Sequence, residues 1–214
     1  FWFGSTDPHR PYKWESGVES GMDPRAVEVP ACLPDSETVR KDICDYYWEV
    51  QRFDREVGEL LEMLRERDEL DSTLVVITGD NGMPFPRCKS NLYGLGTNVP
   101  LAVRWPGQIE GGRIVRDFVS LQDLAPTFLK AAGLEPPAEM TGRSLLPILT
   151  SGRSGRLEAA RDHILTGKER HAWVRKGGLG YPCRAIRTDD FLYIRNFEPD
   201  RWPAGDPKNG GEPY

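Results

Sequence analysis

The sequence predicts an α/β fold, with helices covering a sheet, and two adjacent stretches carry that prediction. Residues 74–78 (Leu-Val-Val-Ile-Thr) form a β-branched run typical of a strand buried on both faces. Before it, residues 36–67 place apolar side chains at three- and four-residue steps, which indicates an amphipathic helix. A short polar link joins the two, and a helix followed by a strand is typical of an α/β unit.

Composition narrows the possible classes of protein. The 214 residues suit one sizeable domain with a small appendage. A net charge of −5 argues against a general nucleic-acid binder, which usually carries a basic face. The chain has no run of about 18 apolar residues, so no membrane span is predicted. The four cysteines lack zinc-site spacing but leave disulfides open: Cys32, Cys44, Cys88 and Cys183.

The sequence begins with Phe1–Ser5, which is typical of the interior of a strand and has no leading Met or signal peptide before it. We therefore interpret the chain as part of a longer protein. Two prolines then stiffen the loop that carries His9 and Arg10. His9 and Asp80 each follow the end of a predicted strand, so parallel pairing of the two strands would bring both residues to the same edge of the sheet. The alternative is that His9 is an ordinary surface residue. Residues 12–35 predict a long surface loop.

The predicted helix at 36–67 is structural. Asp35 or Ser36 is placed to cap its first turn. Its apolar stripe would cover the sheet, and its charged face is interpreted as a solvated surface made of Glu49, Arg52, Glu56, Arg65 and Glu66.

The strand at 74–78 ends in Gly79-Asp80-Asn81-Gly82, which is the first candidate site. Ligands bind beyond the carboxyl ends of strands in open α/β sheets. Asp80 and Asn81 offer the hard oxygen ligands that Ca²⁺ or Mg²⁺ prefers. The same four residues are also typical of a simple turn, because Asn and Asp tolerate left-handed backbone and bond their own main chain.

The remaining elements follow from short local patterns. We expect a loop at 83–98, a strand at 100–105 and a helix at 121–132 that ends at Gly133. A polar, Gly-containing stretch at 150–161 separates domains 1–150 and 151–214. The second domain should hold short antiparallel strands at 163–166, 183–187 and 191–195, followed by an extended tail.

Several separated blocks, in the same order, resemble type I sulfatases of the alkaline-phosphatase-like superfamily. The blocks are 73–82, 98–107, 119–127 and 142–147, with a Pro-His segment at 7–9. The particular amino acids at 82–86, 91–93 and 181–187 resemble the heparan N-sulfatase (sulfamidase) branch of this family. The resemblance implies that 1–150 is the C-terminal half of the catalytic domain, with part of an alkaline-phosphatase-like sheet flanked by helices. It implies a small antiparallel α+β subdomain in 151–214.

The resemblance also implies site residues. Asp80 and Asn81 fall on the family's Ca²⁺ ligands, and Lys89 and His9 fall on residues that contact the sulfate. Negative charge grows on the transferred group and leaving atom of a sulfate ester or sulfamate, so cations and a metal there lower the barrier. Histidine titrates near neutrality, so His9 could protonate the leaving group.

Three further residues are candidates for substrate binding. Arg10 could orient the anion or simply be solvated. Arg87 neighbours Lys89 and could reach an acidic sugar. His171 could face the substrate from the second subdomain, and Cys88 could be a bystander thiol or half of a disulfide.

One departure from the family pattern is decisive. The family's nucleophile is a formylglycine made from the cysteine of a Cys-x-Pro/Ala-x-Arg motif, and the sequence has no such motif. The resemblance therefore implies that the nucleophile and the remaining Ca²⁺ ligands lie outside these residues. It implies an inactive fragment of an exported or lysosomal sulfatase that acts on O- or N-sulfated sugars, such as glycosaminoglycans.

Two other functions remain open. A phosphodiesterase or phosphonate monoester hydrolase of the same superfamily would share the metal and anion geometry. A sulfatase-like binding domain without catalysis is the alternative from another class.

Overall fold

The computed structural model describes residues 1–171 and 175–201, and the chain divides into two compact units. The first unit comprises Phe1–Thr73 with Met83–Lys89, and the second comprises Leu74–Gly82 with the described residues from Ser90 onward. This division differs from the domains expected from the sequence, and the boundary near residue 150 stays a prediction.

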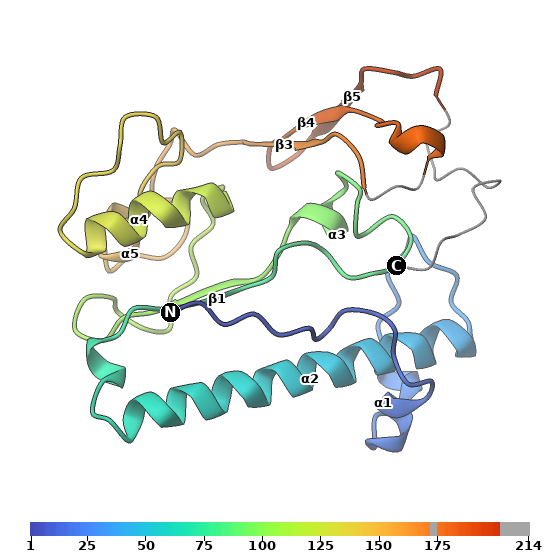
Figure 1. The fold of residues 1–214 in the computed structure, drawn as a ribbon, viewed down its shortest axis with the longest axis horizontal. Helices are drawn as coiled ribbons and strands as arrows, with labels where there is room; N and C mark the ends of the chain where they lie inside the picture. Colours follow the sequence, from blue (N-terminus) through green and yellow to red (C-terminus); the bar gives the residue numbers. More distant parts are fainter. Residues whose placement is uncertain (172–174, 202–214) are drawn as a thin grey trace. The chain divides into compact units, whose positions relative to one another are not determined.

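A long helix dominates the first unit (Figure 1). Its N-terminal cap is the predicted Ser36, whose Oγ accepts a hydrogen bond from the Val39 amide at 3.3 Å. The predicted helix is therefore confirmed. The helices of this unit are α1 (Ser16–Glu19), η1 (Pro24–Ala26), α2 (Glu37–Arg65) and η2 (Leu70–Ser72).

The apolar core of the first unit joins α2 to the loop at 83–89. Ile43 and Cys44 of α2 are each 1% exposed, and they cluster with Phe85 and Cys88 of that loop. Burying these side chains fixes the loop on the helix, because the apolar surface is removed from water. Lys89 directly follows Cys88, so its backbone is held in place by this packed core.

The strand expected at Phe1–Ser5 is not formed. These residues lie outside any strand, and Phe1 and Trp2 are 94% and 87% exposed. An aromatic run indicates strand propensity, but a strand also needs a neighbour to complete its hydrogen bonds. No strand among the described residues pairs with this segment.

The loop expected at 12–35 contains the short helices α1 and η1. Buried Asp45 of α2 holds α1 in place, because its carboxylate accepts from the amides of Glu15 at 3.0 Å and Gly17 at 2.9 Å. A side chain at Gly17 would meet the Cys44 carbonyl at 2.3 Å, so α1 approaches α2 more closely than other residues permit.

The charged face of α2 is only partly the solvated surface that the sequence suggested. Glu49 is 6% exposed and Asp45 is 1% exposed. Asp42 and Arg52 lie on the same face of the helix as these two residues, because the four positions are separated by three, four and three residues. We call this set the polar stripe of α2: Asp42, Asp45, Glu49 and Arg52. The prediction failed for Glu49 because its burial depends on chain segments outside the helix, which the spacing of residues along α2 does not reveal.

The first sheet of the second unit has two strands, β1 (Val75–Thr78) and β2 (Leu101–Arg104). Both strands were predicted, but they pair antiparallel, with Val75 opposite Arg104 and Thr78 opposite Leu101. The parallel neighbour expected for β1 is not present among the described residues. The side chains of β1 are half-buried rather than buried on both faces, since a β-branched run specifies a strand but not its partner.

The predicted helix at 121–132 is present as η3 (Leu121–Asp123) and α4 (Leu124–Ala131). Gly133 has a φ of +75°, as expected for the residue that ends a helix. The other helices of the second unit are α3 (Gly94–Thr97), α5 (Leu146–Leu149) and η4 (Lys176–Gly178). No helix in the described part of the chain is long and apolar enough to span a membrane.

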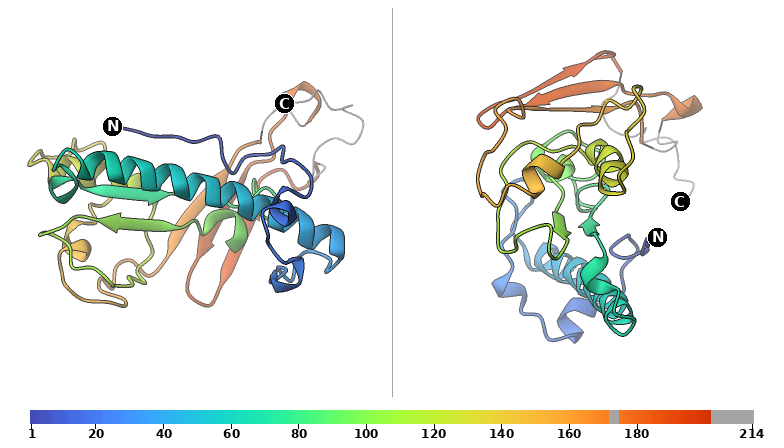
Figure 2. Two further views of the ribbon diagram at one scale, coloured as in Figure 1. Left: turned by 90° about the horizontal axis from the view of Figure 1, so that it is seen from below. Right: turned by 90° about the vertical axis from the view of Figure 1, so that its left-hand side faces the viewer.

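A three-stranded antiparallel sheet, β3–β4–β5, confirms the strands predicted beyond residue 161 (Figure 2). The strands are β3 (Ile164–Lys168), β4 (Cys183–Arg187) and β5 (Leu192–Asn196). Inward-facing Cys183 and Ala185 of β4 are buried with Leu92 and Tyr181. Of the extended tail expected at 198–214, the part after Arg201 lies outside the described residues.

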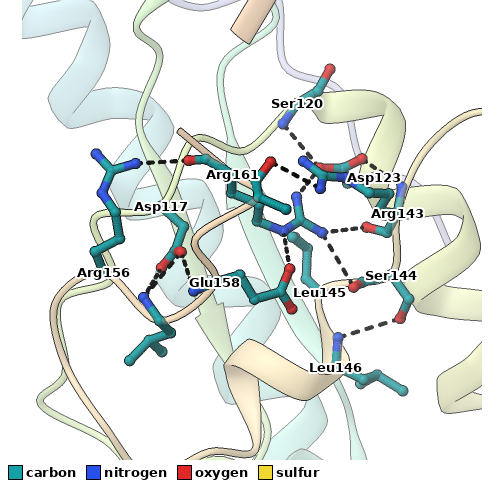
Figure 3. A network of polar contacts seen from close by, with 12 residues as sticks. Asp117, Ser120, Asp123, Arg143, Ser144, Leu145, Leu146, Arg156, Glu158 and Arg161 are labelled. Carbon is teal, nitrogen blue, oxygen red and sulfur yellow. Dashed lines mark hydrogen bonds and ion pairs between the residues drawn. The ribbon is translucent and has the colours of Figure 1, made fainter. Parts of the chain in front are cut away.

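A buried arginine organises the segment around α4 (Figure 3). Arg161 is 1% exposed and donates to the Asp123 carboxylate at 2.7 Å and to the Glu158 carboxylate at 2.9 Å. It also donates to the carbonyl oxygens of Arg143 and Ser144. The arginine thus ties together turns that lie up to 38 residues apart in the sequence.

Candidate functional site

His9 lies on an exposed loop of the first unit. Its amide donates to the Thr6 carbonyl at 2.8 Å, and its Nδ1 lies 2.6 Å from the Arg10 carbonyl oxygen. A carbonyl oxygen only accepts, so Nδ1 carries the proton in this contact. The arrangement leaves Nε2 as the nitrogen that can exchange a proton with a ligand, as a general acid requires.

Arg10 is held by a bidentate ion pair. Its two terminal nitrogens donate to the Asp42 carboxylate at 2.9 and 2.6 Å. This pairing raises the pKa of Arg10 above its ordinary value. The guanidinium also stacks over the rings of Tyr12 at 4.6 Å and Phe85 at 4.9 Å. Much of its hydrogen-bonding capacity is thus used within the protein, and its role toward an anion stays a prediction.

Lys89 ends a compact loop in the same unit. Its amide and that of Phe85 both donate to the Met83 carbonyl, at 3.0 and 2.9 Å. Arg10 Nε donates to the Pro84 carbonyl of this loop at 3.1 Å, across 74 residues of sequence. The structure therefore brings together the two segments that carry four of the predicted site residues: His9, Arg10, Arg87 and Lys89.

Within that loop, Lys89 and Arg87 differ in their surroundings. Lys89 is half-buried, whereas Arg87 is exposed and has a φ of +65°. The buried thiol of Cys88 between them has a pKa raised by its burial. All four cysteines are free, so the disulfide alternative is not realised in the structure.

Asp80 and Asn81 follow β1 in the second unit, at the predicted turn. Asp80 is exposed and Asn81 is half-buried. The Gly82 amide donates to the Gly96 carbonyl at 3.1 Å, and a side chain at Gly82 would meet the Leu95 carbonyl oxygen at 1.9 Å. The turn is therefore packed closely against α3 and holds both side chains on a fixed backbone.

The two side chains fit part of a calcium site. A carboxylate and an amide oxygen are suitable donors, but Ca²⁺ takes about six to eight oxygens. Among the described residues, no group of three or more His, Cys, Asp and Glu side chains could hold a metal ion. Asp80 and Asn81 alone therefore do not complete a coordination shell.

The convergence of all predicted site residues stays a prediction. His9, Arg10, Arg87 and Lys89 belong to the first unit, whereas Asp80, Asn81 and His171 belong to the second. His171 is exposed and immediately precedes residues outside the described part of the chain.

Sequence reasoning missed the polar stripe of α2 as the element that holds the His9 loop. Asp42 contacts Arg10, and Arg52 contacts Asp7 at 3.2 Å. The available signal was the recurrence of acidic residues at three- and four-residue steps on the helix.

Two family matches cover most of the chain. Residues 6–134 match the family described as sulfatase. The chain belongs to the sulfatase family. Residues 88–209 match the family described as N-sulphoglucosamine sulphohydrolase, C-terminal, in agreement with the branch indicated by the sequence.

Similar proteins of known activity are longer than this chain. Human N-sulphoglucosamine sulphohydrolase is 35% identical over 184 residues, covering 81% of this chain and 35% of the relative. An ulvan-active sulfatase from Formosa agariphila is 29% identical over 173 residues, covering 81% of this chain and 27% of the relative. The chain therefore spans only about a quarter to a third of the length of these relatives.

Solved structures confirm the alkaline-phosphatase-like α/β fold. BT4656, solved in complex with its substrate D-glucosamine-2-N,6-O-disulfate, matches with a TM-score of 0.62 and 26% identity, covering 78% of this chain and 37% of that one. The phosphonate monoester hydrolase of Agrobacterium radiobacter matches with a TM-score of 0.65 and 26% identity, covering 78% of this chain and 35% of that one.

Proposed function

We propose that these residues are part of a calcium-dependent sulfatase that hydrolyses sulfate esters or N-sulfate groups on sulfated sugars. Membership of the sulfatase family is the observation that carries this proposal. The human relative is named for its action on N-sulphoglucosamine, and BT4656 was solved with a glucosamine disulfate as substrate. Sulfated glycosaminoglycan-like sugars are therefore the proposed substrate class.

The proposed chemistry gives each candidate residue a separate task. His9 would protonate the leaving oxygen or nitrogen through Nε2, because its Nδ1 is engaged with the main chain. The Lys89 ammonium would neutralise charge on the sulfate. Asp80 and Asn81 would hold Ca²⁺, which supplies polarisation of the sulfate oxygens when bound.

The remaining roles concern recognition of the substrate. We propose that Arg10, Arg87 and His171 contribute contacts to the sugar or its anionic groups. We also propose that the formylglycine nucleophile and the other calcium ligands come from residues outside these 214, which predicts no turnover by this chain alone.

The proposed location is exported or lysosomal. A Drosophila melanogaster relative, 37% identical over 119 residues, is named an extracellular sulfatase, which supports the exported alternative.

The central test measures calcium-dependent hydrolysis of N-sulphoglucosamine and of an aryl sulfate by the complete enzyme that contains these residues. We expect Asp80→Ala and Lys89→Ala each to lower kcat/KM by about 10²–10³-fold, because the first removes a ligand of the proposed Ca²⁺ and the second removes a cation that neutralises the sulfate. Asp54→Asn, an exposed carboxylate on α2, is the matched control and should retain activity. Unchanged activity in Asp80→Ala would overturn the proposed metal site.

A second function is favoured by one observation, the structural likeness to a phosphonate monoester hydrolase. Comparing turnover of an aryl sulfate, an aryl phosphate diester and a phosphonate monoester separates the two activities. If turnover of the phosphonate is faster than turnover of the sulfate by about tenfold or more, the second function is favoured. This ratio corresponds to about 1.4 kcal/mol in activation free energy. A binding domain without catalysis would instead show no calcium uptake and no effect of Asp80→Ala.

A further inference from the structure

The loop that carries His9 is fastened to α2 on both sides of the histidine. On one side, Arg10 pairs with Asp42 through two hydrogen bonds. On the other side, Asp7 Oδ2 lies 3.2 Å from Arg52 Nε. The exposed imidazole therefore lies between two ion pairs that both end on the polar stripe of α2. The two attachments are unequal, and the difference determines how they respond to pH.

The Asp7 attachment contains two carboxyl groups and one guanidinium. Arg52 Nη1 donates to Glu49 Oε2 at 2.9 Å, in addition to its contact with Asp7. The carboxyl side chains are largely buried, at 12% exposure for Asp7 and 8% for Glu49, whereas Arg52 is 47% exposed. The two acids therefore lie inside and the single cation lies outside, which leaves an excess of negative charge away from water.

Other groups around Glu49 do not remove this excess. Burial raises the pKa of the Glu49 carboxyl, the Arg52 guanidinium lowers it, and the carboxylates of Asp7 and Asp45 raise it again. Asp7 and Glu49 contact the same guanidinium, so the two acidic groups lie close to each other. Tyr12 is a further titratable neighbour, and burial raises the pKa of its phenol, which stays neutral.

We propose that Glu49 takes up a proton in the folded chain and, with Asp7 and Arg52, forms an acid-favoured clasp that positions His9. The proton is taken up from water by the Glu49 carboxyl when the clasp closes, so the two acidic side chains then carry one negative charge against the guanidinium. The proposal rests on the proposed function only for the role of His9. Arg10–Asp42 is the constant attachment, and Asp7–Arg52, which lies beside Glu49, is the variable one.

The expected direction with pH follows from linkage. The pKa of Glu49 is raised above its ordinary value of 4.5 in the folded chain. The stabilisation is therefore fully present below that ordinary value and is lost as the pH rises through the raised one. A sulfatase that works in an acidic compartment would thus hold the His9 loop closed, and neutral pH would loosen it.

The test measures hydrogen-exchange protection of the amides of Asp7 and His9, expressed relative to intrinsic rates so that the pH dependence of exchange itself cancels. These amides donate within the loop, to Ser5 Oγ and to the Thr6 carbonyl. In the 214-residue chain, we expect protection to fall as the pH rises from 4.5, by about tenfold for each unit by which the Glu49 pKa is raised.

Two variants at the same position distinguish positioning from plain structural support. Glu49→Gln keeps a neutral hydrogen-bonding side chain and should hold protection constant across pH. Glu49→Ala removes the partner and should give low protection at every pH. Glu59→Gln, an exposed glutamate on the same helix, is the matched control and should behave as the unsubstituted chain.

The outcomes separate this proposal from the proposed function. An unchanged pH dependence in Glu49→Gln, or a flat profile in the unsubstituted chain, would overturn the clasp whatever the enzyme does. If Glu49→Gln fails to fold by circular dichroism, Asp7→Asn on the loop gives the same test. In the active complete enzyme, Glu49→Gln should also extend the kcat/KM profile to higher pH. If hydrogen exchange in Glu49→Gln is constant across pH as expected but the enzyme only loses activity, the clasp stands and only the role of His9 is contradicted.

Discussion

The two units each contain a cluster of two carboxylates around one arginine, but only the second unit buries the arginine. In the second unit Arg161 is innermost, at 1% exposure, and Glu158 reaches toward water at 34%. In the first unit Glu49 and Asp7 are innermost and Arg52 is outermost. The Arg161 cluster holds turns together permanently, because its cation has matched acceptors. The Arg52 cluster leaves acidic groups in excess, so protons can regulate it.

The largest expected effect comes from removing the buried arginine. Arg161→Leu leaves Asp123 buried without its charged partner, so we expect a loss of about 3–5 kcal/mol in the free energy of unfolding. Arg52→Leu should cost about 1 kcal/mol or less, because Arg52 is half exposed and Glu49 can become neutral by taking up a proton. Urea unfolding of the chain, followed by circular dichroism, measures both. Equal losses would show that the two clusters do not differ as described.

Close backbone packing gives the next effect, and it tests one position in each unit. A side chain at Gly142 would meet the Gln122 carbonyl oxygen at 2.2 Å, and one at Gly17 would meet the Cys44 carbonyl at 2.3 Å. Alanine at either position should lower the free energy of unfolding by about 1–3 kcal/mol, since backbone atoms must move. Urea midpoints provide the measurement. A neutral Gly17→Ala would contradict the close approach of α1 to α2.

A glycine in open space supplies the opposite sign. Gly58 lies within α2, is exposed, and has no atom within 4 Å of an added side chain. Gly58→Ala should raise the free energy of unfolding by about 0.8–1.0 kcal/mol, because alanine favours the helix interior. The same urea experiment measures it and serves as the control for the two buried glycines. A loss of stability would indicate that this part of α2 is covered.

The smallest effect is expected at an exposed ion pair of the second unit. Asp189 is 66% exposed and pairs with Arg156 at 2.5 Å. Asp189→Asn should cost about 0.2–1 kcal/mol at low salt, and the cost should shrink in about 1 M salt, where exposed charges are screened. Unfolding measured at the two salt concentrations checks this. A larger cost, unaffected by salt, would place Asp189 with the buried clusters instead.

The sequence by itself determined the elements whose signals are local. The periodic apolar residues and Ser36 specified α2, and the β-branched run specified β1. The patterns at 183–187 and 191–195 specified two antiparallel strands, which the structure confirms as β4 and β5. Each of these depends on neighbours within a few residues, so a single sequence contains the whole signal.

The residues of the candidate site were predictable from the sequence, but the contacts that hold them in place were not. The sequence located Asp80 and Asn81 at the end of a strand, and it located His9 on a stiff loop. It did not reveal that Arg10 is committed to Asp42, because that pair is separated by 32 residues. A charged residue has the same local pattern whether its partner is water or another side chain.

Only the tertiary structure decided which partners meet. It paired β1 antiparallel with β2, left Phe1 and Trp2 exposed, and buried Glu49 and Arg161. Burial of a charge is settled by groups that neutralise it from distant segments, and strand pairing is settled by which edges come together. The spacing of residues along one element shows which side chains share a face but not which distant segment covers that face, which is why helix α2 was predicted correctly while the burial of its polar stripe was not.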